Sequence, residues 1–255
     1  MIRSMVNIDR VIKFCNDRID VNKIKDFPGA WNGLQVENNG EITKIGAAVD
    51  AGLFPFQIAT EKEIDFLIVH HGLFWSPPTP LTGASYEKIK HCMDHNLAIY
   101  SAHLPLDCHS EIGNNAILAK RLNLAECDGF LDFEGNKIGL LTDCNFSRED
   151  LKTRLQQEFP SGMQSIEFGS KHPTKIGILS GSGQSAVDQI LNVGADTLIT
   201  GELKQQHFNY AQEKGLNLYV CGHYATETFG VEALAKEAAE KFNLPYEFVD
   251  TNCPL

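Results

Sequence analysis

Several features that define other classes of protein are absent from this chain of 255 residues. No apolar run approaches the roughly 18 residues that a membrane-spanning helix needs. Near the amino terminus, Asn7, Asp9 and Arg10 interrupt the apolar stretch that a secretory signal would require. We therefore expect a soluble, cytoplasmic protein that has no contact with a membrane.

Positive charge is also in short supply. Lys and Arg together number 22 against 33 Asp and Glu, which leaves a formal net charge of −11. Such a surface repels phosphate backbones, so nucleic acid is an unlikely partner.

Closely spaced cysteines are missing as well. The seven cysteines lie far apart and include no Cys-x-x-Cys pair. We therefore expect reduced thiols, as in a cytosolic protein.

Short β-rich runs alternate with helical patterns along most of the chain, which predicts an α/β fold of layered sheets with flanking helices. The segment 127–136 is rich in turn formers and acids, and we interpret it as a crossing between two halves. The first half would comprise residues 1–128 and 221–255, and the second residues 129–220. The predicted strands are 44–49, 65–70, 97–102, 137–141, 175–179, 196–200, 216–220 and 246–249.

Histidines stand at the ends of two predicted strands, where α/β proteins gather their functional groups. The strand 65–70 ends in His70 and His71, followed by Gly72, and the strand 97–102 is followed by His103. Successive strand residues point to opposite faces, so we expect His70 and His71 to converge only where Gly72 lets the strand break. Two imidazoles aimed differently suit two metal ions better than one.

Carboxylates accompany these histidines. Asp107 follows His103, and we expect Pro105 between them to prevent a regular helix. His223 and Glu227 follow the strand 216–220, and their i,i+4 spacing places both on one face of a helix.

Together these six side chains form a nitrogen and oxygen donor set suited to Zn, Mn, Fe or Co, in one or two sites. We assign the bridging position between two cations to Asp107. The predicted ligands are His70, His71, His103, Asp107, His223 and Glu227.

Two further features allow more than one interpretation. The turn from Gly181 to Gly183 follows a strand and opens a helix, which fits either a tight turn or a loop that holds a phosphate. Glu202 ends another strand, and it is either a helix-start carboxylate or a proton carrier. The loop 76–83 contains three prolines and is a candidate rim for a pocket.

The motifs Trp31-Asn-Gly-Leu-Gln-Val-Glu37, His70-His-Gly72, Ser101-Ala-His103, Thr200-Gly-Glu202 and Gly222-His-Tyr-Ala-Thr-Glu227 occur in this order. As a set they resemble the NIF-three-like dinuclear metal-centre hexameric proteins, a family also labelled GTP cyclohydrolase I type 2 homologues. The resemblance implies two interlocked α/β halves, a homohexamer, and two divalent metal ions in each subunit. It carries metal-ligand roles onto the same six residues.

The family label further implies a dinuclear-metal-dependent hydrolase that opens the purine ring of GTP. Glu202 would carry the proton, the Gly181–Gly183 turn would receive the triphosphate, and Asn32 or Gln35 would contact the base. The alternatives are a metallohydrolase of another nucleotide or phosphoester, and a non-enzymatic hexamer that handles metal or binds other proteins.

Overall fold

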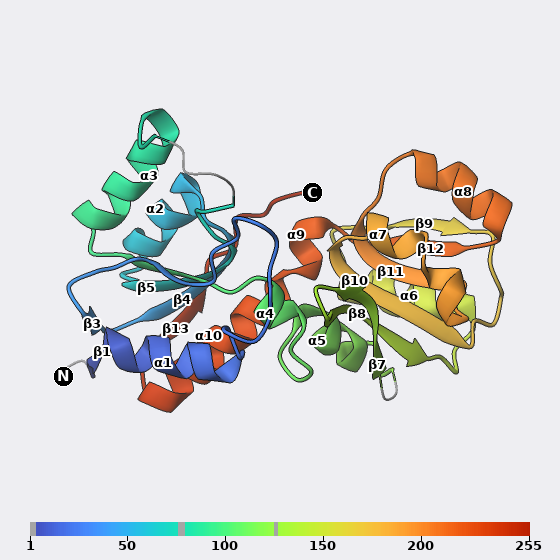
Figure 1. Cartoon of the computed structure of the whole chain (residues 1–255), viewed down its shortest axis with the longest axis horizontal. Helices are drawn as coiled ribbons and strands as arrows, with labels where there is room; N and C mark the ends of the chain where they lie inside the picture. Colours follow the sequence, from blue (N-terminus) through green and yellow to red (C-terminus); the bar gives the residue numbers. More distant parts are fainter. Residues whose placement is uncertain (1–3, 76–79, 125–126) are drawn as a thin grey trace. The chain divides into compact units, whose positions relative to one another are not determined.

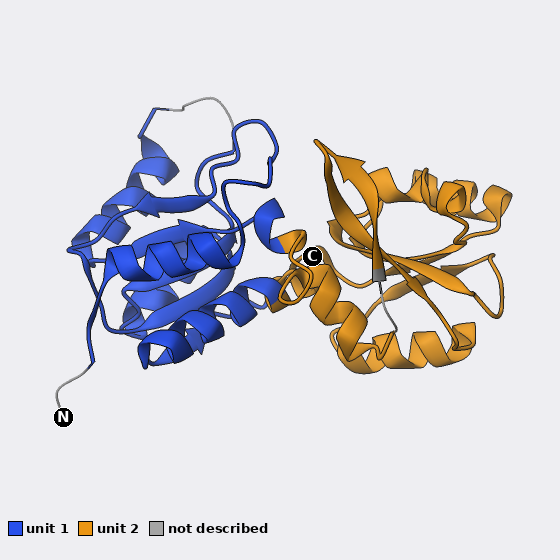
Figure 2. Ribbon diagram, turned by 60° about the horizontal axis from the view of Figure 1, so that its bottom comes forward, with its two compact units in different colours: residues 1–106, 230–252 blue, residues 107–229, 253–255 orange. Residues whose placement is uncertain are grey.

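The computed structural model describes residues 4–75, 80–124 and 127–255, so part of the proline-rich loop 76–83 lies outside the described residues. The chain divides into two compact units, which Figure 2 shows in different colours. Unit 1 comprises Met1–Leu106 and Gly230–Asn252, and unit 2 comprises Asp107–Phe229 and Cys253–Leu255. The observed boundaries differ from the predicted ones at residues 128 and 221. One reason is that α5 (Asn114–Arg121) packs on the strands of unit 2.

The sheet of unit 1 has the spatial order β13-β4-β5-β6-β2. The first four strands run parallel, and β2 joins the edge antiparallel to β6. These strands are β13 (Tyr246–Phe248), β4 (Ile45–Asp50), β5 (Phe66–His71), β6 (Ala98–Ser101) and β2 (Gly33–Val36), and a separate pair is formed by β1 (Val6–Asn7) and β3 (Glu41–Ile42).

Helices cover both faces of this sheet (Figure 1). On one face, Phe56 of α2 packs with Leu67 and Val69 of β5, and α3 packs against α2. The other face carries α1, whose start is capped by the Asn7 side chain, and most of α10. The helices are α1 (Ile8–Arg18), α2 (Leu53–Glu61), α3 (Gly83–Asp94), the single turn α4 (Leu104–Asp107) and α10 (Thr228–Phe242).

The sheet of unit 2 has the spatial order β7-β8-β10-β11-β12-β9, with β10, β11 and β12 parallel and the outer strands antiparallel. Leu151 and Leu155 of α6 pack against Ile178 and Ile199 of this sheet. The strands are β7 (Cys127–Phe133), β8 (Asn136–Asp143), β9 (Gln164–Glu167), β10 (Lys175–Ser182), β11 (Thr197–Glu202) and β12 (Asn217–Val220). The further helices are α6 (Arg148–Glu158), α7 (Gln184–Val187), the 3-10 helix η1 (Ile190–Val193), α8 (Gln206–Lys214) and α9 (His223–Thr226).

The α/β class and all eight predicted strands are confirmed, but the interpretation of 127–136 as a crossing between halves is wrong. This segment forms strand β7 and a hairpin with β8 inside unit 2. Glu134 and Gly135 make the two-residue turn, both with positive φ (50° and 83°), as type I′ hairpins require. The acids that suggested a loop belong to an edge strand, where charged residues are common.

The expectation that Pro105 prevents a helix is also wrong. Leu104–Asp107 forms one helical turn with Pro105 in its first turn, where proline costs no hydrogen bond. Within the described residues, the helices are too short or too polar to cross a membrane.

Candidate metal centre

The three histidines predicted at strand ends of unit 1 lie together. His70 and His71 are the last residues of β5, and His103 follows β6, the neighbouring parallel strand. Their ring centroids are 4.9 Å (His70–His71), 4.8 Å (His70–His103) and 5.7 Å (His71–His103) apart. One ring nitrogen from each lies within 4.8 Å of the others. The three nitrogens can therefore bind one ion together. We call His70, His71 and His103 the histidine triad.

Each histidine of the triad uses its Nδ1 atom in a hydrogen bond to the protein. His70 Nδ1 donates to the carbonyl oxygen of Ala102 over 2.8 Å, and His71 Nδ1 donates to Asp50 Oδ1 over 2.8 Å. His103 Nδ1 donates to both carboxylate oxygens of Asp26, at 2.9 and 3.1 Å. These bonds favour the tautomer whose Nε2 carries the lone pair, which is how metal-binding histidines are usually oriented.

Asp26 ties the triad to an irregular loop. Its carboxylate also accepts hydrogen bonds from the Asn32 side chain and from the backbone N–H of Leu104. Burial alone would raise the pKa of Asp26, but the hydrogen bonds from His103 and Asn32 hold it below its ordinary value. Asp26 therefore stays charged and orients His103.

Trp75 closes one side of the triad. Its ring centroid lies 5.5 Å from that of His71 and 4.7 Å from that of His103, nearly perpendicular to the latter. The indole Nε1 donates to the carbonyl oxygen of Gly72, which holds the ring in this position. The indole shields the two imidazoles on this side from water.

Asn32 and Gln35 are used by the chain itself. The Asn32 amide joins Asp26 to the backbone N–H of His103, at 2.7 Å on each side. The Gln35 amide joins the carbonyl oxygen of Trp31 to the N–H of Leu73, at 2.6 Å on each side. A Cβ at Gly72 would collide with Gln35 and with Ser101 Oγ, so this glycine makes room for that link. Both amides thus hold the loops around the triad rather than a nucleobase.

In unit 2, His223 lies between two carboxylates. Its Nε2 is 3.2 Å from Glu227 Oε2, and its Nδ1 is 3.4 Å from Glu202 Oε1. The i,i+4 pairing across α9 confirms the predicted common face of His223 and Glu227. The hydrogen bond and charge of Glu227, with a smaller contribution from Glu202, raise the pKa of His223 to about 9 although burial opposes this.

Asp107 lies at the beginning of unit 2. Its Oδ1 accepts a hydrogen bond from Asn114 Nδ2 over 2.7 Å and lies 3.5 Å from Ser180 Oγ. These contacts orient the carboxylate, and the bridging role of Asp107 stays a prediction.

The glycine-rich turn packs against the His223–Glu227 pair. Gly181 has a φ of +63°, and a Cβ there would collide with Glu227 and lie 3.1 Å from His223 Nε2. Its N–H donates to Thr226 Oγ1, and the N–H of Gly183 donates to the carbonyl oxygen of Glu202. With these donors in use, the turn is explained by close packing and requires no phosphate.

The chemistry of both groups fits a divalent metal ion. Imidazole nitrogens with a carboxylate oxygen are the donors that Zn, Mn, Fe and Co accept, and soft thiolates are not needed. Burial raises the pKa of the nearby Cys221 to about 12, which keeps this thiol protonated and unsuited as a ligand.

The sequence profile of the family Duf34/NIF3 (NGG1p interacting factor 3) matches residues 6–254. The chain belongs to this family. It is 35% identical to the protein named GTP cyclohydrolase 1 type 2 homolog of Deinococcus radiodurans over 97% of this chain and 94% of the relative. It is 36% identical to the protein of the same name from Halobacterium salinarum, over 96% and 98%.

Among solved structures, the chain is similar to that of TTHA1606 from Thermus thermophilus, with a TM-score of 0.87 and 35% identity. The similarity covers 98% of this chain and 100% of the other. The resemblance inferred from the motifs is thereby confirmed at the level of the Duf34/NIF3 family and its fold.

Three residues around the triad were missed by the sequence analysis of this Duf34/NIF3 chain. Asp50 ends β4 and pairs in register with His71, so the rule of strand ends could have found it. Asp26 lies in an irregular loop where no periodicity marks it. Trp75 follows the histidine pair by four residues, but nothing local shows that its ring packs on His71 and His103.

Proposed function

We propose that this chain is a dinuclear-metal-dependent hydrolase that opens the purine ring of a nucleotide such as GTP. The anchoring of all three triad histidines through Nδ1 carries this proposal, because it presets their Nε2 atoms for a cation. The proposed ligands of the two divalent ions are His70, His71 and His103 of unit 1 and Asp107, His223 and Glu227 of unit 2.

When bound, the divalent ions supply Lewis-acid chemistry for the attack of water on an electrophilic carbon. The chain itself orients the ligands: Asp26 and Asp50 hold His103 and His71, and Trp75 limits the access of solvent on one side of them. In the proposed reaction one water opens the imidazole ring of the purine and a second releases formate.

Glu202 is the proposed proton carrier. Its side chain is 49% exposed, so it can exchange protons with solvent, and its carboxylate lies beside His223. General acid–base groups typically contribute 10²–10⁴-fold to the rate. We expect Glu202→Gln to reduce turnover by about 10²-fold or more, whereas Glu213→Gln, an exposed glutamate of α8, leaves it unchanged.

The experiment begins with metal analysis of the full chain, purified without chelator or added metal. The protein is then reconstituted separately with Zn, Mn, Fe and Co and incubated with GTP, and formate and phosphate are measured. Metal-dependent release of formate supports the proposal. Phosphate without formate would favour a phosphoester hydrolase, and no turnover with any of these metals would favour a non-enzymatic metal-handling protein.

Assembly is a separate part of the proposal. The family resemblance implies a homohexamer, and sedimentation equilibrium of the full chain measures it directly. A mass of six chains supports the prediction, and a monomer or dimer at micromolar concentration contradicts it.

A further inference from the structure

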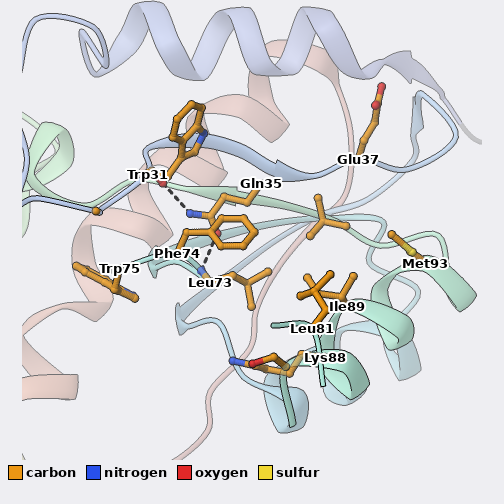
Figure 3. Close-up of a pocket in the computed structure, with 13 residues that line it drawn as sticks. Trp31, Gln35, Glu37, Leu73, Phe74, Trp75, Leu81, Lys88, Ile89 and Met93 are labelled. Atoms are coloured by element: carbon orange, nitrogen blue, oxygen red, sulfur yellow. Dashed lines mark hydrogen bonds between the residues drawn. The ribbon is translucent and has the colours of Figure 1, made fainter. Parts of the chain in front are cut away.

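Unit 1 contains a cavity of about 800 Å³ that the metal chemistry above does not use. It lies between the loop before β2, the residues after β5, and helix α3 (Figure 3). Its volume is in the range of small-molecule sites, which span about 300–1,000 Å³. The lining residues used below are Trp31, Phe74, Trp75, Ser85 and Lys88.

Three aromatic rings stand among the aliphatic side chains that line this cavity. The sequence contains two tryptophans, and both of them, Trp31 and Trp75, line it together with Phe74. Trp31 is 64% exposed and Phe74 is 43% exposed, although burial in a core would be the ordinary position of such rings. Aromatic side chains exposed to a cavity can stack on a planar ring of a ligand. In proteins that bind nucleic acids, such stacking contributes about 1–3 kcal/mol for each base.

The cavity shares a wall with the histidine triad. Trp75 lines the cavity and also packs on the rings of His71 and His103. A molecule in the cavity would therefore lie one indole ring away from the proposed metal ligands. A purine whose carbonyl-bearing six-membered ring is held in the cavity can direct its imidazole ring past the indole edge towards these ligands.

Two charged side chains line the cavity, Lys88 and the exposed Glu37, and the donor Lys88 favours an acceptor on that molecule. Lys88 of α3 extends along the edge of the cavity opposite Trp31 (Figure 3) and offers an ammonium donor. Ser85, one turn earlier on α3, adds a hydroxyl. Gln35 also lines the cavity, but its amide is used by Trp31 and Leu73.

From these observations we infer that the cavity binds a planar nitrogen heteroaromatic ring that carries a carbonyl oxygen. The ring stacks between the aromatic walls, and the carbonyl oxygen accepts a hydrogen bond from Lys88. The inference deepens the proposed function, on which it rests for the identity of the molecule as substrate, but binding of the ring can be measured without turnover.

The test titrates the full chain with guanosine, which carries the ring and the carbonyl but no phosphate. Binding is followed by calorimetry and by tryptophan emission, because both tryptophans line the cavity. We expect saturable binding with a change in emission, no binding of ribose, and weaker binding of adenosine, which has an amino group in place of the carbonyl.

Variants locate the site. Trp31→Leu should weaken guanosine binding by about tenfold, and Ser85→Phe should abolish it by filling the cavity. Lys88→Met should weaken guanosine by about tenfold and adenosine by less than about twofold, because a hydrogen bond to a charged donor is lost only with guanosine. Phe54→Leu is the matched control: this aromatic ring on α2 is 59% exposed and lies outside the residues found to line the cavity.

Absence of saturable guanosine binding overturns the inference, as does undiminished binding by Ser85→Phe. A Trp31→Leu protein that binds guanosine normally but sediments differently would indicate that Trp31 lies in an interface between copies of the chain. This result would also overturn the inference. Guanosine binding without formate release from GTP contradicts the proposed function alone. Formate release by a Ser85→Phe protein at the normal KM contradicts this inference alone.

Discussion

The histidine triad of unit 1 and the His223 group of unit 2 differ in the hydrogen-bond partners of their imidazoles. In unit 1, three histidines lie together, and the Nδ1 proton of each is directed to an oxygen of the protein. In unit 2, one histidine lies between the carboxylates of Glu202 and Glu227, and its pKa is raised to about 9. The first group directs its Nε2 atoms to a cation through its Nδ1 hydrogen bonds, whereas at the second a cation must displace the proton of His223.

The difference follows from where each histidine stands in its unit. The triad lies at the ends of the adjacent parallel strands β5 and β6, so its nitrogens face oxygen acceptors from β4 and from the loop around Asp26. His223 begins a four-residue helix, and its nearest titratable neighbours are the carboxylate one turn later and the one that ends β11. In unit 1 the position of the backbone therefore orients the histidines. In unit 2 the two nearby carboxylates set the charge of His223.

The largest expected effect is the loss of metal from the triad. His71→Ala should remove bound metal and leave the fold intact, because His71 lies at the strand end rather than in the core. His95→Ala, an exposed histidine at the end of α3, is the matched control and should retain the metal. Elemental analysis after dialysis, with circular dichroism for the fold, checks both. Full metal content in His71→Ala would contradict the assignment of the triad.

A core substitution separates stability from metal binding. Leu67→Ala in β5 should cost about 2–5 kcal/mol by leaving a cavity in the core cluster that it shares with Phe56 and Val69. In unit 2, Leu151→Ala should cost a similar amount in a cluster that has its own members. Urea unfolding measures both costs. Equal metal affinity of the folded Leu67→Ala and wild-type proteins would support the separation, and unchanged unfolding midpoints would contradict the core assignment.

Removing the carboxylate charge that is hydrogen-bonded to a triad histidine should weaken metal binding without abolishing it. Asp26→Asn and Asp50→Asn keep the shape of each partner but remove the charge that orients His103 and His71. We expect metal affinity to fall about 10–100-fold in each, the usual effect of such partners. Competition titration with a chromophoric chelator measures the affinity. Asp188→Asn, which changes an exposed acid of unit 2, is the control, and a loss as large as in Asp26→Asn would contradict the positioning role.

The smallest effect concerns the pH dependence of unit 2 in metal-free protein. Because folding raises the pKa of His223 from 6.5 to about 9, its contribution to stability is fully present below pH 6.5 and is lost as pH rises through 9. We expect wild type to exceed Glu227→Gln in stability by roughly 1–2 kcal/mol near pH 6, with the difference shrinking towards about pH 9.5. Urea unfolding across this range tests it, and a difference that grows with pH would contradict the pairing.

Local patterns in the sequence predicted much of this architecture. A buried strand appears in the sequence as a short apolar run, independent of the elements that it packs against. The bounds of β4, β5, β6 and β10–β12 were therefore predicted to within a few residues. Histidines at strand ends followed from the same runs, which is why His70, His71 and His103 were predicted together. β7 was missed because an edge strand tolerates the acids and glycine that otherwise mark a loop.

By itself, then, the sequence determined the α/β class and the chemical nature of the ligands, because side-chain alternation and residue type are local properties. Only the tertiary structure decided which oxygen each histidine faces, since Asp26 and His103 are 77 positions apart and Asp50 and His71 are 21 apart. It alone also brought Trp31 and Trp75 to one cavity and used Asn32 and Gln35 as links between loops. Such partners depend on how distant loops pack over strand ends, and no periodicity of the chain encodes that packing.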